Sequence, residues 1–209
     1  CGASLISPRF LATAYHCFYN SDLKINFDND CSIPGTCYAV IREHDLTKEE
    51  VGQRNISIIL IHSPSGDSDL ALAELEYPVE LDKKAQLVRY AEERLSVGDL
   101  VWSLGWGMTR VGTYPEVLLK VRLRVSAVDL EGDLTSTEVG NANGIPMDPC
   151  SGDSGGPLLA ERNGELLLYA TLFGGGYNYR ANITKGYGEW NSLAPHKDWI
   201  QEILNLAGA

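Results

Sequence analysis

The feature that constrains this chain most is a glycine-rich turn around one serine, the run GDSGGP at residues 152–157. Glycine, serine and aspartate are common turn residues, so the run alone indicates only a loop. Two earlier segments change that reading, because His16 lies in TAYHC and Asp69 directly precedes LAL. A serine becomes a nucleophile at neutral pH when an imidazole accepts its proton, and a carboxylate must fix the tautomer of that imidazole. The three segments together predict a catalytic site of His16, Asp69 and Ser154.

The order of these residues restricts the fold that can bring them together. α/β-Hydrolases carry the same residue types in the order Ser, Asp, His and subtilisins in the order Asp, His, Ser, whereas the order here is His, Asp, Ser. This order and the three segments resemble the trypsin/chymotrypsin family of serine peptidases, as do CGASLI at 1–6, GWG at 105–107 and DWI at 198–200. The resemblance spans nearly the whole chain.

The resemblance implies an all-β fold of two six-stranded antiparallel β-barrels with a C-terminal helix. Residues 1–209 would form one domain with halves at roughly 1–92 and 93–209. Short aliphatic runs bounded by turn residues predict strands at 56–62, 100–104, 118–125, 157–160 and 166–173. An apolar stripe predicts the helix at about 195–206, and no run of 18 apolar residues suggests a membrane-spanning helix.

The resemblance also assigns roles within the predicted site. His16 would be the general base and Ser154 the nucleophile, with the backbone amides of Gly152 and Ser154 forming the oxyanion hole. Asp69 would orient the histidine from the start of an alternating strand. Asp67 lies two residues earlier, but the run DLAL matches the family only when Asp69 is used, so Asp67 is interpreted as a solvated loop residue.

Substrate specificity is expected from the floor and walls of a pocket beside the serine. Asp148 lies six residues before Ser154, the position that holds an aspartate in trypsin-like relatives and selects Arg or Lys; the alternative is a loop aspartate in MDP. Gly174 and Gly188 match the open walls of that pocket, and Phe173 with Gly174 matches the pair that binds the substrate backbone. The run GGG at 174–176 leaves a shift of one residue open.

Five cysteines leave one without a partner. The resemblance pairs Cys1 with Cys17, and the short turn-rich loop between Cys31 and Cys37 predicts a second disulfide. Cys150 is then expected to be unbridged within this chain.

Disulfides and the sequons at Asn55 and Asn182 indicate a secreted glycoprotein. A net charge of −11 argues against nucleic acid as a partner and suits solubility in an extracellular fluid. A polypeptide substrate is the partner that the predicted site implies, and no membrane partner is expected.

Relatives begin about two dozen residues before their first cysteine, and their terminal ammonium pairs with the carboxylate that corresponds to Asp153. This chain opens on Cys1 without that segment, which leaves three alternatives: the segment is a separate chain, it lies outside the sequence given, or the protein is inactive in this form. A separate N-terminal chain and a protein inhibitor are therefore candidate partners. The acidic run 43–53 resembles the family's calcium loop, but a solvated acidic loop is the favoured interpretation. No metal and no cofactor are predicted.

Two functions are therefore considered. The first is a secreted trypsin-like endopeptidase that cleaves after Arg or Lys through an acyl-enzyme. The alternative is a non-catalytic homologue that serves as a binding or regulatory module.

Overall fold

The computed structural model describes the chain except for residues 19–35, 67, 110–111, 139–147, 178–185, 207 and 209. The strands of the first half are β1 (Ser4–Ser7), β2 (Phe10–Ala14), β3 (Tyr38–Ile41), β4 (Arg54–His62) and β5 (Leu70–Leu75). The strands of the second half are β6 (Arg89–Tyr90), β7 (Leu100–Gly105), β8 (Leu119–Val128), β9 (Leu134–Glu138), β10 (Pro157–Arg162), β11 (Glu165–Tyr177) and β12 (Gly186–Ser192). The helix α1 (Lys197–Leu206) follows a short 3-10 turn, η3 (Ala194–His196).

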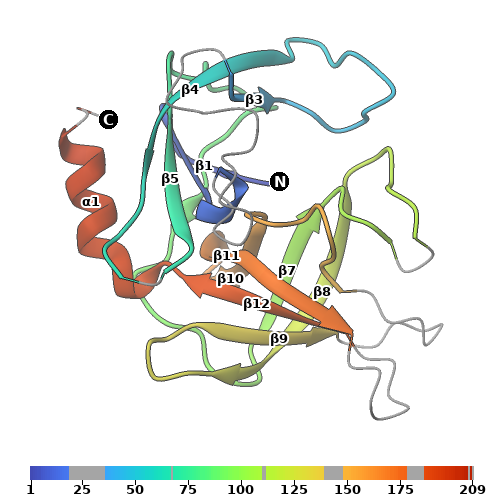
Figure 1. Cartoon of the computed structure of the whole chain (residues 1–209), viewed down its shortest axis with the longest axis vertical. Helices are drawn as coiled ribbons and strands as arrows, with labels where there is room; N and C mark the ends of the chain where they lie inside the picture. The colour runs from blue at the N-terminus through green and yellow to red at the C-terminus, as the bar shows by residue number, and fades with distance from the viewer. Residues whose placement is uncertain are drawn as a thin grey trace.

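The strands form two sheets, one above the other in Figure 1. The second sheet has seven strands in the order β10-β7-β8-β9-β12-β11-β6, and pairing of β10 with β11 closes all of them except β6 into a barrel. The first sheet has five strands in the described residues, in the order β1-β2-β5-β4-β3, and remains open there. The all-β fold with a C-terminal helix is confirmed, but only the second half is a closed six-stranded barrel in the described part of the chain.

Three apolar clusters hold this arrangement together. One lies inside the second barrel around Trp190 and Tyr169, and one lies inside the first sheet around Leu11 and Ile58. The third joins the two halves and α1. Its buried members are Ile6, Phe10, Ala12, Leu70, Leu72, Leu159, Leu168, Leu193, Ile200 and Leu204. The ends of β2 and β5 are thereby fixed against the second half, which is where the predicted site lies.

Two local predictions need correction. The strand after Asp69 does not alternate between buried and exposed residues, because β5 is buried from Leu70 to Ala73. Its two faces pack against different clusters, one between the halves and one inside the first sheet. The helix begins at Lys197, since Pro195 belongs to the preceding 3-10 turn. All five predicted strands are present. Four of them extend by one to four residues beyond the predicted bounds, whereas β8 begins one residue later and ends three residues later than predicted.

Candidate active site

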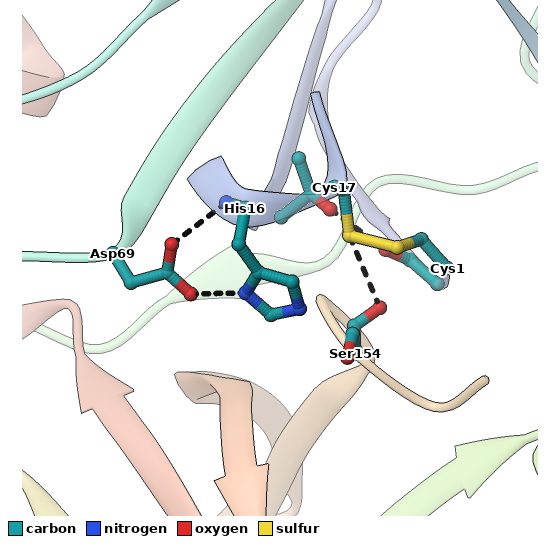
Figure 2. The surroundings of a disulfide bond; sticks show 7 residues. Cys1, His16, Cys17, Asp69 and Ser154 are labelled. Atoms are coloured by element: carbon teal, nitrogen blue, oxygen red, sulfur yellow. Dashed lines mark hydrogen bonds and ion pairs between the residues drawn. A yellow bond between two sulfur atoms is a disulfide. The ribbon is translucent and has the colours of Figure 1, made fainter. Parts of the chain in front are cut away.

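His16 and Asp69 meet where β2 and β5 run side by side. Ala14 at the end of β2 pairs with Leu70 at the start of β5. The segment that leaves β2 and the segment that enters β5 are therefore neighbours. His16 lies in a 3-10 turn, η1 (Tyr15–Cys17), that directly follows β2. The Asp69 carboxylate accepts two hydrogen bonds, at 2.7 Å from the His16 backbone amide and at 2.5 Å from His16 Nδ1. Figure 2 shows both bonds, which fix the imidazole plane relative to the carboxylate.

Ser154 approaches the same turn from the second half. Its carbonyl oxygen accepts a hydrogen bond from the Gly2 amide at 2.7 Å and lies 3.7 Å from the disulfide-bonded Sγ of Cys17. In Figure 2 the His16 ring lies between Asp69 on one side and Ser154 on the other. Both residues are described, and the structure contains no hydrogen bond between Ser154 and the His16 ring. The histidine–aspartate contact is present, whereas the hydrogen bond expected between a nucleophilic serine and its general base is not formed.

The backbone around Ser154 forms a tight glycine turn. The Asp153 amide donates to the Cys150 carbonyl at 2.9 Å, and the Gly155 amide donates to the Leu172 carbonyl at 2.7 Å. Gly152 has a φ of 99°, a conformation that residues with a Cβ rarely adopt. Within the described ranges, no acceptor takes a hydrogen bond from the amides of Gly152 or Ser154. These two amides are the donors expected for an oxyanion.

Gly2 and Thr13 support the serine turn, and the sequence interpretation did not identify them. Thr13 Oγ1 donates to the Gly2 carbonyl at 2.8 Å, which holds Gly2 in place to bond Ser154. A Cβ on Gly155 would lie only 2.4 Å from the Gly2 carbonyl oxygen and 2.2 Å from Thr13 Oγ1. The only hint in the sequence was the pair of glycines after the serine, since close backbone approach requires residues without side chains.

Asp153 lies in a cradle made by the GWG segment. Its carboxylate accepts hydrogen bonds from the Gly107 amide at 2.7 Å and from the Cys150 amide at 3.0 Å. A Cβ on Gly105 or Gly107 would come within 2.2 Å of this carboxylate. Burial raises the pKa of Asp153 above its usual value, although the two amide bonds oppose that shift. The charged form is therefore costly here unless a cation approaches it.

The predicted specificity residues lie at one end of β11 and β12. The Asp148 carboxylate packs against Gly186, the first residue of β12, and its oxygens are shielded from solvent. Gly188 lies two residues further along β12, but its partner across the sheet is Gly175 rather than Gly174. The register thus favours the one-residue shift that the GGG run left open. Phe173, half-buried, directly precedes this segment.

The disulfide between Cys1 and Cys17 is formed, with their Cα atoms 6.2 Å apart, as predicted. It joins the start of the chain to the turn that carries His16. Cys37 is disulfide-bonded, whereas Cys31 lies outside the described residues. Cys150 is a free thiol, as expected.

Other predicted features are only partly described. Asn55 is exposed on β4, and Asn182 lies outside the described residues. In the acidic run 43–53, Asp45 bonds Lys48 and Thr47, which lower its pKa to about 2. The Glu43 carboxylate accepts a hydrogen bond from the Gln53 amide at 2.8 Å.

The part of the chain that the structure describes contains no cluster of three or more His, Cys, Asp or Glu residues suited to a metal. Among the described helices, none is long and apolar enough to cross a membrane.

Comparisons with known proteins agree with this fold. The family model described as Trypsin matches residues 1–200. The chain is 30% identical to "Trypsin-1" of Astacus astacus over 217 residues, which cover 96% of this chain and 86% of that protein. It is 25% identical to "Mannan-binding lectin serine protease 1" of Mus musculus and 26% identical to the Homo sapiens protein of the same name, with 99% of this chain covered. The chain spans 32% of the length of those two proteins.

Proposed function

Because this chain belongs to the trypsin family, we propose that residues 1–209 form a single serine endopeptidase domain that cleaves polypeptides after Arg or Lys. The observation that carries this proposal is the doubly bonded His16–Asp69 pair beside the glycine turn of Ser154. A structural histidine does not need a carboxylate that bonds both its ring and its backbone amide, whereas a general base of fixed orientation does.

The proposed reaction follows from the atoms that face one another. With a carboxylate at Nδ1, the neutral imidazole carries its proton on that nitrogen and keeps a lone pair on Nε2. That lone pair takes the proton of Ser154 Oγ while Oγ forms a bond to the scissile carbonyl carbon. The imidazolium then donates the proton to the amine nitrogen as the C–N bond breaks, which leaves an acyl-enzyme. Water attacks the acyl carbon in the same way and releases Ser154.

The amides of Gly152 and Ser154 are proposed to bind the oxyanion that forms on the carbonyl oxygen. Their lack of acceptors within the described residues supports this role. Loss of one such donor costs about 3 kcal/mol of transition-state stabilisation in comparable enzymes.

We propose that Asp148 binds the cationic side chain of the residue before the cleaved bond. A shielded carboxylate gains from a guanidinium, whose fork matches both carboxylate oxygens. The cross-strand pairing of Gly175 with Gly188 supports a pocket wall without side chains, with Gly175 taking the place expected of Gly174.

A second candidate is a non-catalytic homologue that acts as a binding or regulatory module. The observation that favours it is the unformed hydrogen bond between Ser154 and His16. Substrate binding tightens such bonds in many enzymes, so the peptidase remains the proposal that the geometry supports better.

A peptide assay distinguishes the two. Peptides that differ only in Arg, Lys, Phe or Leu before the scissile bond are incubated with the protein and with Ser154→Ala, and products are identified by mass spectrometry. The peptidase proposal expects cleavage after Arg and Lys by the native protein only. Binding without cleavage of any peptide would support the non-catalytic candidate.

We further propose a secreted, glycosylated protein. Two features are proposed to bind the polypeptide segment that precedes the first cysteine in relatives. The open first sheet borders a hollow of about 790 Å³ beside Cys1, lined by apolar residues such as Leu5, Leu11 and Ile58. The Asp153 carboxylate sits near the chain start with only backbone amides as hydrogen-bond donors in the described residues. A strand filling the hollow and an ammonium reaching Asp153 would satisfy both features.

A further inference from the structure

A carboxylate outside the predicted site occupies the space beside Gly174. Glu189 on β12 is the cross-strand partner of Gly174 on β11. A Cβ on Gly174 would lie 2.8 Å from Glu189 Oε2, so the carboxylate fills the space that a side chain at position 174 would take. Glu189 is half-buried, and none of the ion pairs among the described residues involves it.

The alternation of side chains along β12 shows which way Glu189 points. Trp190 is fully buried inside the second barrel, where its indole donates to Ser136 Oγ at 2.8 Å. Neighbouring residues of a strand project to opposite faces, so Glu189 lies on the outer face of the barrel. Glu189 and the space over Gly174 therefore share this outer face of the barrel.

The Glu189 carboxylate also lies close to Ser154 when their positions along β11 are compared. The turn around Ser154 is anchored on β11 by two bonds to Leu172, one from the Gly155 amide and one to the Gly156 carbonyl. Gly174 is two residues further along β11, which corresponds to about 6–7 Å of extended chain. P1 is the substrate residue before the cleaved bond. With its side chain in the pocket proposed between β11 and β12, a substrate that runs along β11 would bring the residues before P1 past the Glu189 carboxylate.

We infer that Glu189 selects a second basic residue within the three positions before P1. The inference rests on the proposed function, since it assumes that the cleft binds a polypeptide. A half-buried carboxylate without an ion-pair partner among the described residues attracts a cationic side chain more strongly than a fully exposed one and less strongly than a buried one. The expected preference for Lys or Arg over Gln at the responsive position is about 5–10-fold in kcat/KM. The preferred substrate is thus a segment with paired or closely spaced basic residues.

The experiment uses peptides with Arg at P1 and a single Lys at P2, P3 or P4, and a reference peptide with Gln at all three positions. Rates are measured for the native protein, for Glu189→Gln and for Glu165→Gln. Glu165 is a matched control because it begins β11 at the opposite end and pairs with Arg89. Binding of the same peptides is measured by fluorescence anisotropy in the Ser154→Ala protein, with and without Glu189→Gln.

The inference predicts that the native protein and Glu165→Gln prefer one Lys peptide about 5–10-fold over the reference peptide. Glu189→Gln should abolish this preference and change the rate on the reference peptide by no more than about twofold. An equal preference in Glu189→Gln, or none in the native protein, would overturn it. If no peptide is cleaved at all, the proposed function fails, and the anisotropy measurement alone decides whether Glu189 recognises a basic residue.

Discussion

Replacing Asp69 by asparagine tests how the histidine is held. The carboxylate accepts hydrogen bonds from two donors of His16, its backbone amide and its ring Nδ1. Asparagine offers one acceptor and one donor in the same volume, so one of these contacts becomes donor against donor. The ring can escape only by moving its proton to Nε2, and that nitrogen then cannot accept the proton of Ser154.

The size of the effect follows from those two bonds. A hydrogen bond to a charged group contributes about 1.5–3 kcal/mol, so two contribute about 3–6 kcal/mol. In the family to which this chain belongs, exchange of the triad aspartate for asparagine reduces kcat by about 10⁴. This loss corresponds to about 5.4 kcal/mol at 1.36 kcal/mol per decade. We expect Asp69→Asn to reduce kcat by about 10³–10⁴ at neutral pH while the protein remains folded.

The assay is turnover of an Arg peptide, with circular dichroism to verify folding. Asp67→Asn is the matched control because it makes the same chemical change two residues away, and it should keep kcat within about twofold. A folded Asp69→Asn protein that retains more than a tenth of the native kcat would refute the proposed role of Asp69.

Three further predictions concern the surroundings of the serine. Gly155 has a left-handed backbone, and in Gly155→Ala the new Cβ would also press against the Gly2 carbonyl and Thr13. This variant should destabilise the fold by about 2–4 kcal/mol and lower Tm by about 4–16 °C in calorimetry. An unchanged Tm would contradict the close packing. Because burial raises the pKa of Asp153, its folded state binds the proton more tightly, and stability should fall as pH rises from about 4 through the raised pKa. Denaturant titrations should show a flatter pH dependence for Asp153→Asn, and identical slopes would argue against a buried carboxyl. Asp148→Ser should erase most of a preference for Arg over Phe peptides of about 30-fold to several thousand-fold, and a preserved preference would place the specificity elsewhere.

The residues proposed for the chemistry were predictable because each lies in a short segment whose residue types have few other uses together. The sequence predicted that His16 and Asp69 lie together, and in the structure Asp69 Oδ2 is 2.5 Å from His16 Nδ1. The catalytic roles of these residues and of Ser154 are proposals. The supporting contacts were not predictable in the same way. The Gly2 amide bonds the Ser154 carbonyl in a distant part of the chain, and Thr13 supports this contact through the bond from its hydroxyl to the Gly2 carbonyl. Nothing local in CGA or in ATA indicates these partners.

Tertiary packing explains the other differences. In the GGG run, no side chain marks which residue faces Gly188, so only the cross-strand register identifies Gly175. The strand after Asp69 is buried on both faces because the second half covers the face that a lone sheet would expose to water. Glu189 was overlooked because nothing around it in the sequence indicates that it pairs with Gly174 across the sheet and fills the space over that glycine.

The most direct test of the central claim is covalent labelling of the native protein with a fluorophosphonate, followed by peptide mapping. If His16 activates Ser154, the reagent should label Ser154 stoichiometrically and inactivate the protein, and Ser154→Ala should take up none. Ser151→Ala, an exposed serine of the same turn, should label like the native protein. Absence of label at Ser154 in folded protein, or an equal label on another residue, would contradict the account.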